Sequence, residues 1–229
     1  MQTTNIIIYL FGYVVFFALS RMNKVNNSQR LINDEGAFTS KPGNLIGSHI
    51  IGILWLGVVP VILLKRSVLK IFMGNQMPDI SYILLYILIS ALIISIALRQ
   101  SENINVKKQR SFEGFNQLTA AFFIRYFIIR AVFLFVYELW FRGFLLFDNI
   151  SRMGIPAAVT LNVFLYVMLH IFTSKKEMLA CIPFGLLLCF LSILFNAVWP
   201  AIMLHIGFSL VYELNIYRSY FYTSKIVRL

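Results

Sequence analysis

Residues 131–148 have the sequence AVFLFVYELWFRGFLLFD, an apolar run in which Glu138 and Arg142 are the only charged side chains before the final aspartate. A bilayer core of roughly 30 Å is crossed by a helix of about 20 apolar residues. Similar runs occupy about 5–20, 47–64, 80–98, 154–172, 178–195 and 199–214. Since backbone polar groups in lipid need internal partners, which helices supply, the sequence predicts an all-α polytopic membrane protein with about seven transmembrane helices.

The composition of the 229 residues agrees with this fold class. Hydrophobic residues make up 59% and charged residues 13%, and the mean hydropathy is +0.80, which excludes an ordinary soluble domain and a disordered chain. The net charge of +11 does not indicate nucleic acid, because the basic residues lie in connectors between apolar runs, where they set orientation and contact anionic lipid. We therefore expect the lipid bilayer, and no nucleic acid, as a partner.

The Lys and Arg residues in alternate connectors predict the orientation of the chain. One side has thirteen and the other has four: Arg21, Lys24, Arg30, Lys41, Arg99, Lys107, Lys108, Arg110, Lys175, Lys176, Arg218, Lys225 and Arg228 against Lys65, Arg66, Lys70 and Arg152. Connectors rich in Lys and Arg stay in the cytoplasm. The sequence thus predicts a multi-pass protein of the cell (cytoplasmic) membrane, with its N-terminus outside and its C-terminus in the cytoplasm.

Four ionisable side chains within the apolar runs are candidates for function, because a charge in lipid is costly without a purpose. Glu138 and Arg142 are four residues apart on one helix face and can pair, while His170 and His205 lie in later runs. A carboxylate can accept a proton from water, and an imidazole can hold that water or stabilise an oxyanion, which favours hydrolysis. Two histidines and a glutamate also match the ligands of a hydrolytic zinc centre, and the spacing leaves both possibilities open.

In order and spacing these four residues resemble the motifs of the CAAX-protease and bacteriocin-processing family of intramembrane proteases, known as CPBP or Abi. The family motifs EExxxR, FxxxH and HxxxN are matched by Glu138 and Arg142, by His170 and by His205, within a core of about 112–214. The resemblance implies a four-helix core and an intramembrane endopeptidase, a hydrolase that cleaves a membrane-associated peptide or protein with glutamate-activated water. Prenylated CAAX peptides are the eukaryotic example, and a leader or regulatory peptide is expected where prenylation is absent.

The chain diverges from these motifs at three positions. Tyr137 replaces the first Glu, which the family generally uses to activate water, Tyr166 replaces Phe, and Ser209 replaces Asn. Neighbouring helical residues point about 100° apart, so Glu138 takes the place of the missing carboxylate only if the helix rotates or locally unwinds. We keep Tyr137 as a supporting site residue. The alternative function is a catalytically inactive relative that binds a peptide or partner protein, for example as an immunity factor.

The resemblance also assigns roles to the matched residues. Glu138 is expected to act as the base and Arg142 to orient it, His170 to help hold the water, and His205 with Ser209 to stabilise the oxyanion. No cofactor is expected, and the zinc alternative uses Glu138, His170 and His205 as ligands.

Three segments are expected along the chain: N-terminal transmembrane helices at 1–111, the CPBP-like core at 112–214 and a cytoplasmic tail at 215–229. Residues 112–130 form either an interfacial helix or the first half of a long tilted helix. His49 is expected near the cytoplasmic surface without a role, and Arg125 and Arg130 are expected to extend to the lipid headgroups.

The helix lengths set one condition on the site. At about 1.5 Å per residue, Glu138 lies roughly 10 Å from the inner end of its run and His205 about 9 Å from the outer end of its own. Straight spans of full length do not bring the two together. We therefore expect either that the turn at 196–200 dips into the bilayer or that residues 183–185 shorten the sixth helix.

Overall fold

Every element of secondary structure in the described part of the chain is helical, which confirms the all-α part of the predicted class. The computed structural model describes residues 2–22, 30–31, 42–65, 67–75, 78–102, 119–171 and 174–226. The elements are α1 Gln2–Met22, α2 Pro42–Gly52, η2 Ile53–Val58, α3 Val59–Leu64, α4 Val68–Met73, α5 Ile80–Glu102, α6 Ala120–Glu138, η4 Leu139–Leu146, α7 Phe147–Leu169, α8 Lys175–Phe195 and α9 Trp199–Ile226, where η denotes a π-helix.

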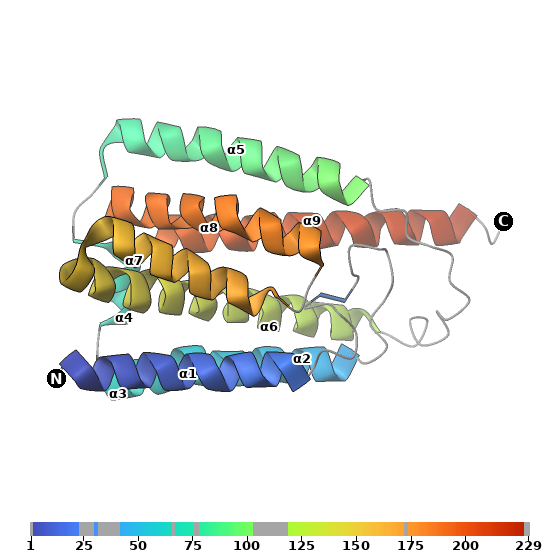
Figure 1. Ribbon diagram of the computed structural model, residues 1–229. Helices are drawn as coiled ribbons and strands as arrows, with labels where there is room; N and C mark the ends of the chain where they lie inside the picture. Colours follow the sequence, from blue (N-terminus) through green and yellow to red (C-terminus); the bar gives the residue numbers. More distant parts are fainter. Residues whose placement is uncertain are drawn as a thin grey trace.

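Several of these elements join into longer rods that lie side by side (Figure 1). The segment η2 connects α2 to α3 without a break, and η4 connects α6 to the start of α7. This second rod ends at Gly154, whose φ of 81° takes the left-handed backbone that glycine adopts at little cost, and the rest of α7 runs back along it. Residues 120–130 are therefore the first part of a long helix, and within the segment expected as a cytoplasmic tail α9 continues through 215–226.

Three described helices are long and apolar enough to cross a membrane: Pro42–Leu64, Ile80–Glu102 and Lys175–Phe195. Asn5–Leu19 is a shorter apolar helix. On α5 the side chains of Leu84, Leu88 and Leu92 are exposed, a spacing that makes one apolar helix face. These helices support a membrane location, and the number of seven crossings stays a prediction.

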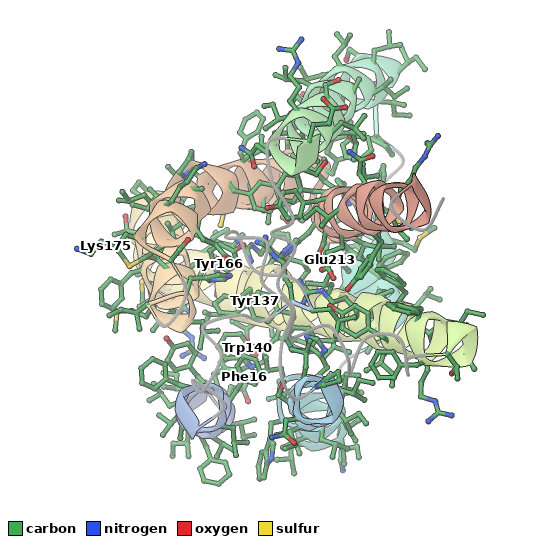
Figure 2. All side chains as sticks on the ribbon, turned by 90° about the vertical axis from the view of Figure 1, so that its right-hand side faces the viewer. Phe16, Tyr137, Trp140, Tyr166, Lys175 and Glu213 are labelled. Carbon is green, nitrogen blue, oxygen red and sulfur yellow. The ribbon has the colours of Figure 1, made fainter. Side chains whose placement is uncertain are left out.

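A buried aromatic layer fixes the middle of the long rod against α1. Trp140 of η4 is fully buried, stacks on Tyr13 with ring centroids 6.0 Å apart and meets Tyr9 edge-on at 6.2 Å. The hydroxyl of Tyr13 donates a hydrogen bond of 3.0 Å to the carbonyl of Leu165, so α1 also holds α7. Figure 2 shows Phe16, Trp140, Tyr137 and Tyr166 inside the bundle. The layer positions the helix that carries Glu138 and Arg142.

The turn between α8 and α9 is recessed into the protein. Ala197 and Val198 are buried there, and the backbone N–H of Val198 donates to the carbonyl of Ile71 in α4 at 3.2 Å. Counted along the helices at 1.5 Å per residue, Glu138 lies about 24 Å from the Gly154 turn, whereas His205 lies about 9 Å from the start of α9. Because the α8–α9 turn is recessed relative to the Gly154 turn, Glu138 and His205 lie at the same level along the bundle. Of the two expectations, a sixth helix shortened at 183–185 is not what the structure shows, because α8 runs unbroken through Pro183. The position of the turn within a bilayer stays a prediction.

Candidate active site

Glu138 and His205 are in direct contact at the interface of α6 and α9. Glu138 ends α6 with a fully buried side chain, exposed fraction 0%, and its Oε1 lies 2.6 Å from Nδ1 of His205. The side chain of His205 is 12% exposed. Because α6 and α9 run in opposite directions (Figure 1), residues that are 67 positions apart in sequence meet here.

Arg142 holds the same carboxylate from the following helical turn. Its Nη1 donates to Oε1 of Glu138 at 3.2 Å and lies 3.0 Å from Oε2, so the pair expected from the four-residue spacing is present. The guanidinium is fully buried and stacks over the ring of Tyr166, with its carbon 4.5 Å from the ring centroid. A cation over an aromatic face is an attractive arrangement. Glu138 is therefore fixed between a guanidinium and an imidazole.

The helix changes its winding directly after Glu138. The π-helical η4 begins at Leu139, and π-helical turns frequently occur at functional sites. The carbonyl of Phe141, within this segment, accepts a hydrogen bond of 2.6 Å from Nδ2 of Asn162 in α7. A local change of winding is the condition under which Glu138 can approach the place of the missing family glutamate.

Tyr137 also faces the interior, beside Glu138. Its ring centroid lies 5.9 Å from that of Tyr166 and 6.3 Å from that of His205. The hydroxyl of Tyr137 is buried and has no hydrogen-bond partner among the described residues. The two tyrosines that replace the family's Glu and Phe thus meet one another at the Glu138–His205 pair.

His170 follows the end of α7 and approaches this pair through Tyr166. The imidazole packs against the ring of Tyr166 with centroids 4.9 Å apart, and its Nδ1 lies 3.0 Å from the backbone carbonyl oxygen of the same tyrosine. The Tyr166 ring lies 6.5 Å from that of His205 as well. Tyr166 therefore contacts both histidines.

Ser209 has partners that the sequence analysis did not consider. Its hydroxyl accepts a hydrogen bond from Nη2 of Arg130 at 3.2 Å and donates to Oε1 of Glu213 at 3.3 Å. Arg130 also donates from Nε to Oε1 of Glu213 at 2.8 Å. The hydroxyl expected to support the oxyanion is thus held one turn away from His205.

The prediction that Arg130 extends to lipid headgroups and that His49 lies at the surface is wrong. Arg130 is 5% exposed and His49 is 3% exposed, and Nη1 of Arg130 lies 3.0 Å from Nε2 of His49. The buried carboxylate of Glu213 supplies the paired charge that a buried guanidinium requires. The sequence contained a signal for this pair, because Arg130 precedes Glu138 by the same eight residues by which Glu213 follows His205.

The residues at the site do not fit a zinc centre. Among the described residues, no group of three or more His, Cys, Asp or Glu side chains could hold a metal ion. The carboxylate of Glu138 already carries the guanidinium of Arg142, whose positive charge opposes a cation at the same oxygens. The ligand set considered from the sequence, Glu138 with the two histidines, is therefore not assembled. Both cysteines, Cys181 and Cys189, are free and buried.

Residues 116–211 match the family model of type II CAAX prenyl endopeptidase Rce1-like proteins. The match covers less than half of the chain, and it includes Glu138, Arg142, His170, His205 and Ser209. No curated protein and no solved structure matches the chain significantly. Together with the apolar helices, the match supports a membrane protein of the protease class whose substrate is a membrane-associated protein. Over residues 116–211 the chain is thus similar to the Rce1-like CAAX endopeptidases, which confirms the resemblance to the CPBP family.

Proposed function

We propose that the chain is an intramembrane endopeptidase that hydrolyses a peptide bond of a membrane-associated polypeptide with water activated by Glu138 and His205. The observation that carries this proposal is the 2.6 Å contact between a buried carboxylate and a partly exposed imidazole in the interior of an apolar helical bundle. Ionisable groups in such surroundings are rarely retained without a function. The match to a protease family supports the same reaction class.

In the proposed mechanism His205 accepts the proton of the water, and Glu138 orients and stabilises His205. Nδ1–H of His205 donates to Glu138, which leaves the lone pair on Nε2 of the imidazole. Because Glu138 is wholly buried and His205 is not, water meets the imidazole first. As the water oxygen attacks the peptide carbonyl carbon, its proton passes to Nε2, and Glu138 stabilises the imidazolium, as a carboxylate does in a Ser-His-Asp triad. When the C–N bond breaks, the same proton passes to the leaving amine.

The oxyanion needs hydrogen-bond donors that are not already engaged. The hydroxyl of Tyr137 and Nε of Arg142 are both buried and have no hydrogen-bond partner among the described residues. A buried donor without a partner is unfavourable by about 1–3 kcal/mol, and a developing oxyanion would remove that penalty. We assign oxyanion stabilisation to these donors in place of Ser209, while His170 keeps its proposed role in holding the water.

The proposed setting is the cell membrane, with the chain crossing it seven times. The chain ends lie at opposite ends of the bundle (Figure 1), as an odd number of crossings requires. The thirteen basic residues of one side favour a cytoplasmic C-terminus. The proposed substrate is a leader or regulatory peptide that reaches the site from the membrane, or a prenylated peptide where that modification exists. The proposed reaction uses no metal.

A cleavage experiment tests this function. Purified protein in vesicles is incubated with a library of lipid-anchored peptides, and new peptide termini are identified by mass spectrometry. The starting protein is expected to produce defined termini, and Glu138→Ala, His170→Ala and His205→Ala are expected to abolish them while each variant still accumulates. The matched control is Arg125→Ala, an exposed position of α6. Cleavage by the Glu138→Ala variant at the original rate contradicts the proposal.

The second candidate function, a peptide-binding or immunity protein without catalysis, is favoured by one observation. Both oxygens of the Glu138 carboxylate lie within 3.2 Å of Nη1 of Arg142, and Tyr137 replaces the family's first acid. In this case the ion pair within the α6–η4 rod is structural, the Glu138–His205 contact joins α6 to α9, and neither activates water. The same experiment separates the two functions, because a binding protein yields no new termini yet retains peptides from the library on the vesicles.

A further inference from the structure

A second buried polar cluster lies on α2, α6 and α9, apart from the residues assigned to the reaction. Arg130 is its centre, and Figure 2 shows its partner Glu213 inside the bundle. The hydroxyl of Tyr126 donates to the other oxygen of this carboxylate, Oε2, at 2.7 Å. We call this set the Arg130 cluster; its members are His49, Tyr126, Arg130, Ser209 and Glu213.

The Arg130 cluster joins the same two helices as the proposed site, but here the acid is on α9 and the basic group is on α6. On α6 an acid, Glu138, pairs with an imidazole of α9; eight residues earlier a guanidinium, Arg130, pairs with the Glu213 carboxylate of α9. The helices are antiparallel, so both contacts cross the same interface about 12 Å apart. One polar contact leaves two helices able to slide or turn about it. Two contacts at this separation fix both the sliding and the rotation.

The geometry of Arg130 makes it suited to set such a register. Its three nitrogens each have a different partner: Nε donates to Glu213, Nη2 to Ser209, and Nη1 lies 3.0 Å from His49. A guanidinium is planar and its donors point in fixed directions. In a buried setting, a displaced partner is not replaced by water, so the arrangement with all partners in place is strongly preferred. Setting a register is the best-attested use of buried polar groups.

We propose that Arg130 is a positioning residue that fixes the register of α9 against α6 and thereby holds Nδ1 of His205 at Glu138. A shift of one residue along α9 displaces His205 by about 1.5 Å along the helix axis and turns its side chain by about 100°, either of which breaks a 2.6 Å contact. Ser209, which binds Arg130 one turn after His205, is the nearest point of control. Only the catalytic consequence of this inference rests on the proposed function.

The test observes the Glu138–His205 contact directly, by NMR of the full chain with ¹⁵N-labelled imidazoles in detergent micelles. The low-field proton of the Nδ1–H···carboxylate bond is assigned by its disappearance in the His205→Gln variant. In Arg130→Lys and in Glu213→Gln this proton is expected to move or disappear. It is expected to stay in Arg125→Lys, the exposed arginine of the same helix. An unchanged signal in folded Arg130→Lys or Glu213→Gln overturns the proposal.

Two further measurements keep the outcome clear. Should Arg130→Lys not fold, Glu213→Gln and Ser209→Ala decide, since both leave the guanidinium in place. Where the starting protein cleaves a peptide, Arg130→Lys is expected to lower kcat by about 100-fold, the scale of a 1 Å misplacement, with KM within a factor of about two. A protein that cleaves nothing but loses the proton in Arg130→Lys refutes the proposed function and leaves the positioning role in place.

Discussion

The guanidinium of Arg142 lies 4.5 Å above the ring of Tyr166, and Gly185 of α8 packs against both side chains. A Cβ atom at position 185 would lie 3.1 Å from Cδ1 of Tyr166 and 3.6 Å from Nη2 of Arg142. The absence of a side chain on α8 therefore lets the helix approach the ring that contacts both histidines. Position 185 controls how closely α8 covers the proposed site.

Gly185→Ala is expected to displace the Tyr166 ring, because the added Cβ would lie 3.1 Å from Cδ1 of that ring, while the gain of about 1 kcal/mol from alanine in a helix offsets part of the cost of this overpacking. The rate of peptide cleavage is expected to fall by more than the loss of folded protein explains, since Tyr166 supports Arg142 and His170. The measurements are denaturant unfolding in micelles and the initial rate of cleavage. Gly47→Ala of α2 is the matched control: a Cβ there meets nothing within 4 Å, and alanine in a helix is expected to leave stability unchanged or raise it. Equal behaviour of the two variants would contradict this account.

Glu138→Ala is expected to destabilise the protein by about 3–5 kcal/mol, because it leaves the buried guanidinium of Arg142 without its carboxylate. The free energy of unfolding is expected to fall less in the double variant Glu138→Ala/Arg142→Ala than the two single variants predict when their losses are added, since no unpaired charge remains. Unfolding free energies in micelles measure this cycle. Arg125→Ala, at an exposed position, is expected to stay within about 0.5 kcal/mol of the starting protein. Strict additivity would show that the ion pair contributes nothing.

Much of the fold was predictable from apolar run lengths, because helices that satisfy their backbone internally leave a plain hydrophobic signature. The family motifs likewise identified Glu138 and His205, which the structure brings into contact. The Arg130 cluster was missed for a physical reason: an arginine in an apolar run is compatible either with lipid headgroups or with a buried acid, and only packing reveals which one. The contacts of Ser209 with Arg130 and Glu213 were not predictable for the same reason, because a hydroxyl one turn from His205 can face either neighbour.

The orientation of the chain is testable by labelling cysteines from either side of the membrane. A cysteine introduced at Lys225 is expected to react with an impermeant maleimide only after the inner face is exposed, whereas one introduced at Gln2 reacts in intact cells. The reason is the excess of Lys and Arg in the connectors on the C-terminal side. The native Cys181 and Cys189 are buried, and a chain with both changed to Ser provides the background. Labelling of both positions from the same side would show an even number of crossings.

Tyr137→Phe separates catalysis from stability. The substitution removes only a hydroxyl that is buried and has no hydrogen-bond partner among the described residues, so stability is expected to stay the same or rise. If that hydroxyl donates to the oxyanion, kcat is expected to fall by about 10²-fold or more with little change in KM, as when one oxyanion donor is removed. The ring contacts with Tyr166 and His205 remain in the variant, which makes it its own packing control. A variant that keeps full activity assigns the oxyanion to Arg142 alone. Glutamate at position 137 is the complementary change, and a large gain in rate from Tyr137→Glu would show instead that water activation, and not oxyanion binding, limits the natural chain.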